Sequence, residues 1–207
     1  MQTIPADQIG FDFDGVIADI GEVFIRLARV DHGYNSIALE QITTFQVEEC
    51  LDMDLRIVEK IFTDILEDSV GTGLKPMTGA IETLTRLTSI DGVTIITARP
   101  QTDPVRDWLE HHCGSEAAAK MLLVTSGDHD DKERYIRRHN LSYFIDDRVN
   151  TCVQLAASGL TPLVFSQPWN RGQHSLRSVE SWRDIDTMLG FENACDAARP
   201  ATFCRAK

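Results

Sequence analysis

The distribution of apolar residues predicts two kinds of structure along the chain. After residue 90, short apolar runs without strict alternation are separated by stretches in which apolar residues recur at helical spacing. Such runs are typical of parallel strands buried on both faces, with helices covering the sheet. The predicted strands are 93–96, 121–124, 143–145 and 163–165, and the predicted helices are 80–87, 103–114, 131–139, 149–158 and 182–189.

The first 75 residues have a different pattern. One strand is predicted at residues 8–13, and no strand signal follows until after residue 70. Helical spacing of apolar residues predicts helices at 20–30 and 55–66, with a less regular helical stretch at 36–50. The glycine-rich stretch Gly71–Pro76 indicates a linker. Because sites in open parallel sheets lie beyond the carboxyl ends of the strands, an insertion after the first strand would cover such a site as a lid.

These patterns predict an α/β fold. We expect a Rossmann-like three-layer core around a central parallel sheet, with a small all-helical cap inserted after the first strand. The expected boundaries are 1–18 and 75–190 for the core, 19–74 for the cap and 191–207 for a C-terminal tail.

Composition narrows the range of partners. Lys and Arg number 20 against 32 Asp and Glu, a formal net charge of −12 that disfavours nucleic acid as a partner. The five cysteines are scattered and form no CxxC pair, which is typical of reduced thiols in the cytoplasm. No signal-peptide pattern or membrane-length apolar run occurs. We therefore expect a soluble, cytoplasmic protein with no membrane partner; no pattern indicates its oligomeric state.

Polar residues follow the predicted strands where each strand ends. The carboxyl ends of parallel strands meet at one edge of a sheet, so these side chains are expected to lie close together. Alternation along the first strand also predicts that its two carboxylates lean the same way. The residues are Asp12 and Asp14 after the first strand, Thr97 after the second, Lys132 at the helix after the third, and Asp146 and Asp147 after the fourth.

This set of residue types fits phosphoryl transfer with a bound metal. Two neighbouring carboxylates raise each other's pKa unless a cation lies between them, and Mg²⁺ prefers oxygen ligands. A carboxylate can attack phosphorus to form an aspartyl-phosphate, while a second one moves the proton of the leaving oxygen and later of water. A hydroxyl and an ammonium group can stabilise the charge on the transferring phosphoryl group.

In order and context, these segments resemble the four signature motifs of the haloacid dehalogenase superfamily of phosphohydrolases, and the likeness spans nearly the whole chain. The helical insertion resembles that superfamily's C1-type cap. Within the superfamily the chain is most similar to the 5'(3')-deoxyribonucleotidase-like branch. The matching segments are Phe11–Val16, Ile95–Thr97, Lys132 and Phe144–Asp147, and the branch is indicated by Pro76–Ala80 and Phe165–Arg171.

The resemblance implies a role for each matching residue. Asp12 would be the nucleophile and a Mg²⁺ ligand, and Asp14 the general acid and base, with its main-chain carbonyl on the metal. Thr97 would bind a phosphoryl oxygen, and Lys132 would offset the charge of the nucleophile. Asp147 would be the direct acidic metal ligand. Asp146 would either bind the metal as well or support the ligands without touching the metal.

Several other residues have alternative interpretations. Ala98 and Arg99 follow Thr97, so Arg99 could hold a second phosphate or a substrate carboxylate, or form a surface salt bridge. Trp169 is a candidate contact for substrate or lid. Helical spacing places Phe24 and Phe45 in the core of the cap, and the histidines, His129 among them, lack metal-ligand spacing and are expected at the surface.

The sequence thus predicts a Mg²⁺-dependent phosphatase of a small phosphorylated metabolite, with (deoxy)nucleoside monophosphates among the candidates. One alternative is a phosphatase of nucleic-acid ends, which Arg99 suggests and the acidic charge opposes. Another is a catalytically idle binding module of the same fold. A dehalogenase is disfavoured because it would need only one carboxylate in the first motif and no Mg²⁺.

Overall fold

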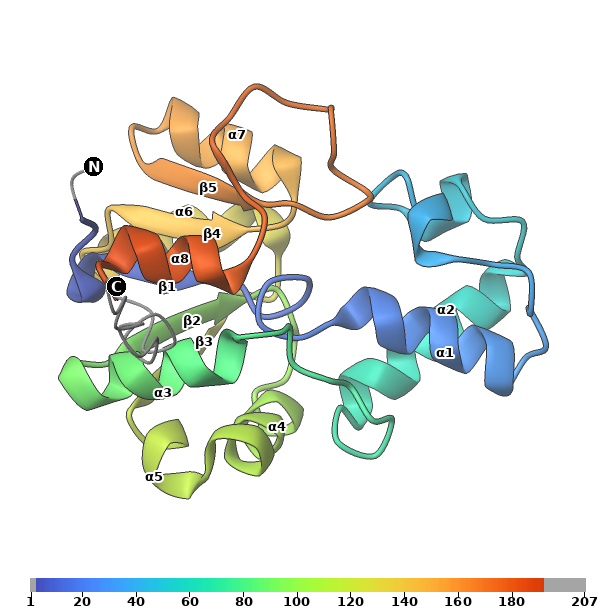
Figure 1. Cartoon of the computed structure of the whole chain (residues 1–207). Helices are drawn as coiled ribbons and strands as arrows, with labels where there is room; N and C mark the ends of the chain where they lie inside the picture. The colour runs from blue at the N-terminus through green and yellow to red at the C-terminus, as the bar shows by residue number, and fades with distance from the viewer. Residues whose placement is uncertain (1–2, 192–207) are drawn as a thin grey trace, which may run out of the picture.

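Six parallel strands form the centre of the structure, a computed structural model in which residues 3–191 are described (Figure 1). Their order in the sheet is β3-β2-β1-β4-β5-β6. The strands are β1 (Ile9–Phe11), β2 (Val93–Thr97), β3 (Met121–Thr125), β4 (Tyr143–Asp146), β5 (Thr161–Phe165) and β6 (Ser178–Val179). This arrangement confirms the predicted α/β fold and adds one short strand, β6, which the sequence did not predict.

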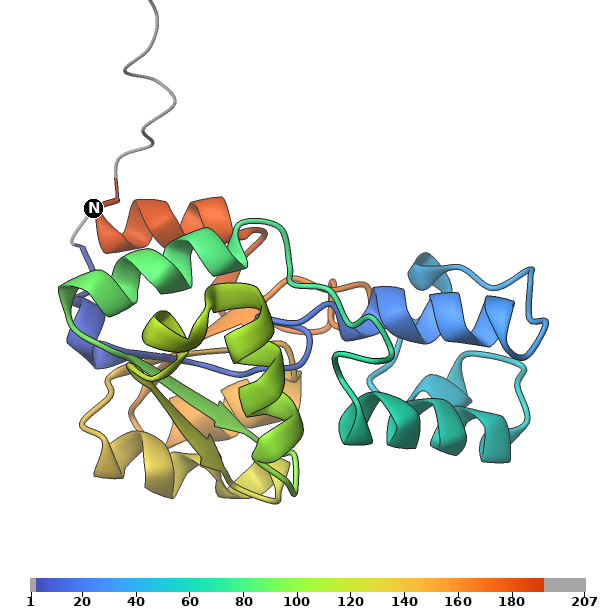
Figure 2. The same ribbon diagram turned by 90° about the horizontal axis from the view of Figure 1, so that it is seen from below.

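Alternation within the buried strands supplies apolar side chains to both faces of the sheet. Ile95 and Ile145 belong to the larger hydrophobic cluster, whereas their neighbours Ile96 and Phe144 pack with Ile136 in a second cluster. Helices therefore cover both faces, and Figure 2 shows α3 and α8 on one side with α6 on the other. The helices of this part are α3 (Ala80–Ile90), α4 (Asp103–Cys113), α5 (Ser115–Ala118), α6 (Lys132–Arg138), α7 (Val149–Ala157) and α8 (Trp182–Leu189).

The strand order reverses direction at β1. The chain proceeds from β1 to β2 and β3 on one side, and then returns to place β4, β5 and β6 on the other. In doubly wound sheets the crevice beyond the strand ends at such a point is where ligands bind. The loops that follow β1 and β4 therefore meet at the position expected for a site.

Between β1 and α3, two helices lie apart from the sheet, beyond its carboxyl edge (Figures 1 and 2). They are α1 (Ile20–Val30) and α2 (Leu55–Glu67). Their apolar faces pack together, and the rings of Phe24 and Phe62 stack with their centroids 4.9 Å apart. Residues 19–74, which hold α1 and α2, are called the cap below.

The segment joining α1 and α2 differs from the prediction of a helix at 36–50. It contains only two short 3₁₀ turns, η2 (Leu39–Gln41) and η3 (Val47–Glu49). Its buried apolar residues are Ile37, Ile42, Val47 and Leu51. Their spacing of five, five and four residues does not keep to one face of a 3.6-residue helix, so burying all four requires an irregular chain.

The first strand is also shorter than predicted, ending at Phe11 instead of residue 13. A tight turn follows, in which Ile17 and Ala18 both donate main-chain hydrogen bonds to Phe13 O. Gly15 has a φ of 72° in this turn, a conformation that glycine adopts without strain. Asp12 and Asp14 therefore lie in a loop, and strand alternation does not govern their directions.

Other expectations concern the chain ends, cysteines and membrane. Only Phe191 of the predicted tail is described; its ring lies 4.3 Å from the Arg86 guanidinium carbon, and residues 192–207 lie outside the described part. Cys50, Cys113 and Cys152 are free thiols. No helix among residues 3–191 has the length and apolarity needed to cross a bilayer.

Candidate active site

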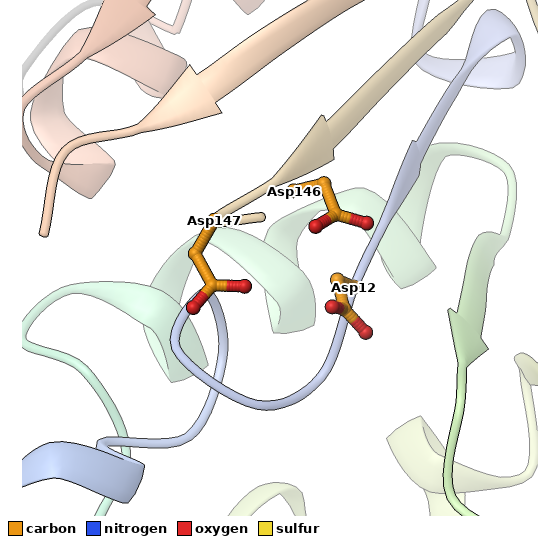
Figure 3. Close-up of side chains that lie close together, drawn as sticks. All are labelled: Asp12, Asp146 and Asp147. Atoms are coloured by element: carbon orange, nitrogen blue, oxygen red, sulfur yellow. The ribbon is translucent and has the colours of Figure 1, made fainter. Parts of the chain in front are cut away.

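Three carboxylates come together beyond the ends of β1 and β4. Asp12 follows β1, Asp146 is the last residue of β4, and Asp147 follows it. One oxygen from each lies within 4.8 Å of the others, and all three residues are buried (Figure 3). Asp12 continues the sheet by one hydrogen bond, its N–H donating to Ile145 O at 2.8 Å. Pairing of β1 with β4 thus fixes the spacing of the acidic cluster.

Lys132 supplies positive charge to this acidic cluster. Its side chain is fully buried at the start of α6, and its Nζ lies 2.7 Å from Oδ2 of Asp12 and donates a hydrogen bond of 2.7 Å to Oδ2 of Asp146. Burial alone would lower the pKa of Lys132, but the charges of Asp12 and Asp146 outweigh burial and raise it. The ammonium group therefore stays charged between the two carboxylates.

Burial has the opposite effect on the carboxylates. It raises the pKa of Asp12 to about 7, although Lys132 opposes the change. Burial and the charge of Asp146 raise the pKa of Asp147 well above its ordinary value, despite the hydrogen bond of 2.8 Å that Trp169 Nε1 donates to Asp147 Oδ2. Three buried carboxylates thus share one ammonium group, and the excess is negative.

This excess charge is the test of whether a metal fits. The ammonium group of Lys132 balances one of the three carboxylates, and one divalent cation would balance the other two. Carboxylate oxygens are also the kind of ligand that Mg²⁺ prefers. Gly15, in the turn after β1, leaves room for the Asp147 side chain because glycine has no Cβ atom; a Cβ atom at this position would lie 2.3 Å from Asp147 Oδ2. The donor set and its charge therefore fit Mg²⁺.

Asp14, two residues after Asp12, forms an ion pair with a different residue. Arg99 Nε donates to its Oδ2 at 2.8 Å, and Arg99 Nη2 donates to its Oδ1 at 2.7 Å. Arg99 follows β2, and its N–H donates to Thr97 Oγ1 at 3.3 Å. Arg99 therefore forms a salt bridge, as one of its two interpretations expected, but the arginine is buried instead of lying at the surface, since its side chain is 3% exposed.

A cavity of about 390 Å³ opens between the acidic cluster and the cap. Most of the predicted site residues line it, whereas Lys132 and Asp146 do not. The site residues along its wall are Asp12, Asp14, Thr97, Ala98, Arg99, Asp147 and Trp169. The side chains that the cap contributes are mostly apolar, with two polar ones beside them: Ile20, Phe24, Ile42, Phe45, Val47, Phe62 and Leu66, and Gln46 and Glu48. The cavity thus has one charged end and one largely apolar wall.

Two expectations about the surroundings of the cavity are corrected. His129 is half-buried and lines the cavity instead of lying at the surface, and burial lowers its pKa. Phe45 is 39% exposed and packs edge-on against His129, with centroids 5.4 Å apart, instead of filling the core of the cap. Helical spacing misplaced Phe45 because its segment is not helical. Phe24 is buried in the cap core and also lines the cavity.

Sequence reasoning did not identify the residues that hold the last loop against the site. Gln167 Nε2 donates to Gly15 O at 2.7 Å, and Asn170 Nδ2 donates to Asp147 O at 2.8 Å. Both side chains are buried. Both residues lie in Phe165–Arg171, the segment that indicated the nucleotidase-like branch, but the sequence assigned no role to either of them.

The fold and the grouping of these residues define a phosphohydrolase of the haloacid dehalogenase superfamily. A family model described as "5' nucleotidase, deoxy (Pyrimidine), cytosolic type C protein" matches residues 6–194. The chain belongs to this family and is a phosphoric monoester hydrolase. This confirms the resemblance found in the sequence.

Individual relatives are distant in sequence. A protein of Oceanobacillus iheyensis named "Putative nucleotidase" is 21% identical over 183 residues, which cover 86% of this chain and 96% of the relative. A HAD family hydrolase from Deinococcus radiodurans, solved with bound phosphate and sodium, has a TM-score of 0.61 at 18% identity and covers 90% of this chain and 96% of its own. A HAD-superfamily hydrolase from Ehrlichia chaffeensis has a TM-score of 0.54 at 15% identity, covering 93% and 100%. The two structures support the fold.

Proposed function

We propose that this protein is a Mg²⁺-dependent phosphatase that hydrolyses a small phosphomonoester through a phosphorylated Asp12. One arrangement carries the proposal: the Asp12 carboxylate lines the cavity while its Oδ2 lies 2.7 Å from Lys132 Nζ. A carboxylate held by a fixed cation beside an open space can attack a substrate there without moving far.

The reaction proceeds in two steps. Asp12 attacks phosphorus, its oxygen–phosphorus bond forms, the ester bond breaks, and the leaving oxygen takes a proton from Asp14. Water then gives a proton to Asp14 and attacks the phosphoryl group, which releases Asp12 and inorganic phosphate. Thr97 would hold a phosphoryl oxygen, and Lys132 would offset the charge that gathers around Asp12.

The residues that would hold Mg²⁺ are Asp12, Asp147 and the main-chain carbonyl of Asp14. Both carboxylate oxygens of Asp146 accept hydrogen bonds from protein groups, Lys132 Nζ at 2.7 Å and Arg148 N–H at 2.8 Å. These bonds favour Asp147 as the direct ligand and Asp146 as a residue that orients its neighbours. When bound, Mg²⁺ would neutralise charge on the carboxylates and on the phosphoryl oxygens.

We further propose a (deoxy)nucleoside monophosphate as the substrate. The family to which the chain belongs supports this, as does a cavity of about 390 Å³ with aromatic side chains opposite the charged end. The cap would act as a lid that admits small substrates and excludes water during the reaction. We also propose that residues 1–18 and 75–190 form the core, that residues 19–74 form the cap, and that the protein is located in the cytoplasm.

The test is phosphate release from a panel of phosphorylated metabolites with Mg²⁺, including (deoxy)nucleoside monophosphates. We expect release from at least one of these nucleotides, and loss of release with a chelator. Failure with every nucleotide but success elsewhere would remove the nucleotide and keep the phosphatase. Salt-sensitive release from oligonucleotides alone would favour the phosphatase of nucleic-acid ends.

A single substitution separates catalysis from the idle binding module. Asp12→Asn preserves the size of the side chain and removes the nucleophile, so we expect it to abolish hydrolysis of a generic aryl phosphate. Hydrolysis at the wild-type rate by this variant would contradict the proposed mechanism. The exposed Asp52→Asn in the cap is the matched control and should hydrolyse the aryl phosphate normally.

A further inference from the structure

Arg99 and Asp14 form a two-point ion pair at the wall of the cavity. The hydrogen bonds join Nε to Oδ2 at 2.8 Å and Nη2 to Oδ1 at 2.7 Å, so both carboxylate oxygens are held. Arg99 is the more buried partner, with its side chain 3% exposed against 23% for Asp14. Such a fork fixes the plane of a carboxylate as well as its distance, which a single point charge would not do.

The conformation of Arg99 is itself fixed by its surroundings. Its guanidinium carbon lies 4.9 Å from the ring centroid of Phe13, the residue between Asp12 and Asp14. The Phe13 ring is fully buried and meets Trp108 edge-on with centroids 5.0 Å apart. Arg99 is therefore held by the core on one side and holds Asp14 on the other.

A third contact extends from Arg99 to the end of the cap. Arg99 Nη1 donates to Ser69 Oγ at 2.7 Å, and Ser69 Oγ donates to Ile65 O at 2.9 Å. Ser69 is 1% exposed and lies just after α2, where the chain returns from the cap to the core. The position of Asp14 is thus connected, through one side chain, to the position of that segment.

We propose that Arg99 is a positioning residue that directs the Asp14 carboxylate at the oxygen of the leaving group, and that Ser69 links this position to the cap. The proposal rests on the proposed function, in which Asp14 gives its proton to that oxygen. Direct capture of a substrate phosphate by Arg99 is the competing interpretation: three of its five N–H donors bind protein groups, and the other two could reach a phosphate.

A residue that acts through Asp14 affects substrates unequally. A poor leaving group, such as the alkoxide of an alkyl phosphate, needs a proton as the ester bond breaks, whereas p-nitrophenolate leaves without one. A residue that binds the phosphate itself would affect both substrates alike. The ratio kcat/KM covers only the events up to breakage of the ester bond, so the second half of the reaction does not obscure the comparison.

The experiment measures kcat/KM of Arg99→Met and Arg99→Lys with glycerol 2-phosphate and with p-nitrophenyl phosphate in the presence of Mg²⁺. We expect Arg99→Met to lose at least about tenfold more on the alkyl ester than on the aryl ester. Arg99→Lys keeps the positive charge but cannot form the two-point ion pair, so its activity on the alkyl ester should fall selectively, almost as much as in Arg99→Met. Arg56→Met, at an exposed arginine on α2, is the control and should change neither substrate.

An equal loss on both substrates, or no loss on either, would overturn the inference while the proposed phosphatase stands. Recovery of both activities by Arg99→Lys would overturn it as well, because charge alone would then suffice. Wild-type protein that releases phosphate from neither ester and from no phosphorylated metabolite of the panel would instead refute the proposed function, and the inference with it; if only the esters fail, a nucleoside monophosphate that it hydrolyses replaces glycerol 2-phosphate as the alkyl ester. If Arg99→Met fails to fold, Ser69→Ala replaces it, with a selective loss of about threefold expected for one hydrogen bond.

Discussion

Trp169 Nε1 donates a hydrogen bond of 2.8 Å to Oδ2 of Asp147, and both residues are buried. The same indole also approaches the cap, because a Cβ atom at Gly21 in α1 would lie 3.2 Å from its Cζ3. One side chain therefore contacts both the acidic cluster and α1 of the cap. Trp169 also lines the cavity, and a contact between its side chain and the substrate stays a prediction.

We expect Trp169→Phe to weaken Mg²⁺ binding. The substitution keeps a ring but removes the N–H that orients Asp147, and loss of such a supporting bond typically costs about tenfold or more in metal affinity. The measurement is the Mg²⁺ concentration that gives half-maximal hydrolysis. Trp182→Phe is the control, because that indole donates to Val16 O and not to the cluster. An unchanged Mg²⁺ requirement in Trp169→Phe would contradict this prediction.

Lys132→Met should abolish most activity and also destabilise the protein. Removing the ammonium group leaves the buried carboxylates of Asp12 and Asp146 without a cation, which costs about 3 kcal/mol or more in the free energy of unfolding. Loss of the fixed charge should reduce kcat by at least about a hundredfold. Urea denaturation and steady-state kinetics measure the two effects.

The matched control is Lys120→Met. Lys120 pairs with Glu116 across one helical turn at the surface, where such pairs contribute about 0.5 kcal/mol or less. Equal losses of stability in Lys132→Met and Lys120→Met would mean that the buried ammonium group does not hold the carboxylates together.

Without metal, the protein should lose stability as the pH rises. Burial raises the pKa of Asp12 to about 7 from 3.8, so between these values the folded state binds more protons than the unfolded state. The free energy of unfolding then falls with rising pH across this window, and Asp147 acts in the same direction. Mg²⁺ should remove most of this loss, because it takes the place of the proton.

Urea denaturation with a chelator and with Mg²⁺, at pH 5 and at pH 8, measures this effect. The stabilisation by Mg²⁺ should be larger at pH 8. In Asp12→Asn the chelated protein should lose less stability between the two pH values, since one of the two carboxyl groups no longer titrates. A chelated wild-type protein that is more stable at pH 8 than at pH 5 would show that these carboxylates do not govern its pH dependence.

Phe45→Ala should impair substrate binding with little effect on stability. The Phe45 ring contacts His129 edge-on, and the Arg148 guanidinium carbon lies 5.4 Å from its centroid, so the ring joins the cap to two loops of the core. Because the residue is 39% exposed, truncation should cost about 1 kcal/mol or less in unfolding. The KM should rise about fivefold, as expected for a loss of about 1 kcal/mol in binding.

Leu55→Ala is the control for Phe45→Ala. Leu55 is an exposed apolar residue of the cap at the start of α2 and does not line the cavity. A similar rise of KM in both variants would mean that the effect comes from general loosening of the cap and not from its contact with His129 and Arg148.

The parallel sheet was predictable because each strand carries its own local signal. Ile95 and Ile96 are both apolar since they face opposite layers, and Thr97 then marks where the strand ends. The convergence of Asp12, Thr97 and Asp147 follows from parallel strand order, which brings like ends to one edge. β6 was missed because two residues carry too little periodicity to be recognised.

Contacts between distant loops were not predictable in the same way. Arg99 meets Asp14 and Ser69 across 85 and 30 residues of separation, and nothing in the local pattern distinguishes this arginine from one at the surface. Likewise, the irregular chain around Phe45 is set by which apolar residues the cap can bury. Such features depend on the packing of whole elements, and local propensity yields to it.

The central place of β1 has a consequence for biosynthesis. Gly10 pairs with Thr94 on one side and with Phe144 on the other, so β1, which is made before the other strands of this sheet, finds its second neighbour only after β4 has left the ribosome. Closing contacts over such long stretches is slow, and until then the apolar strand remains open to mispairing. Truncated chains that stop before β4 should therefore depend on chaperones and accumulate as aggregates.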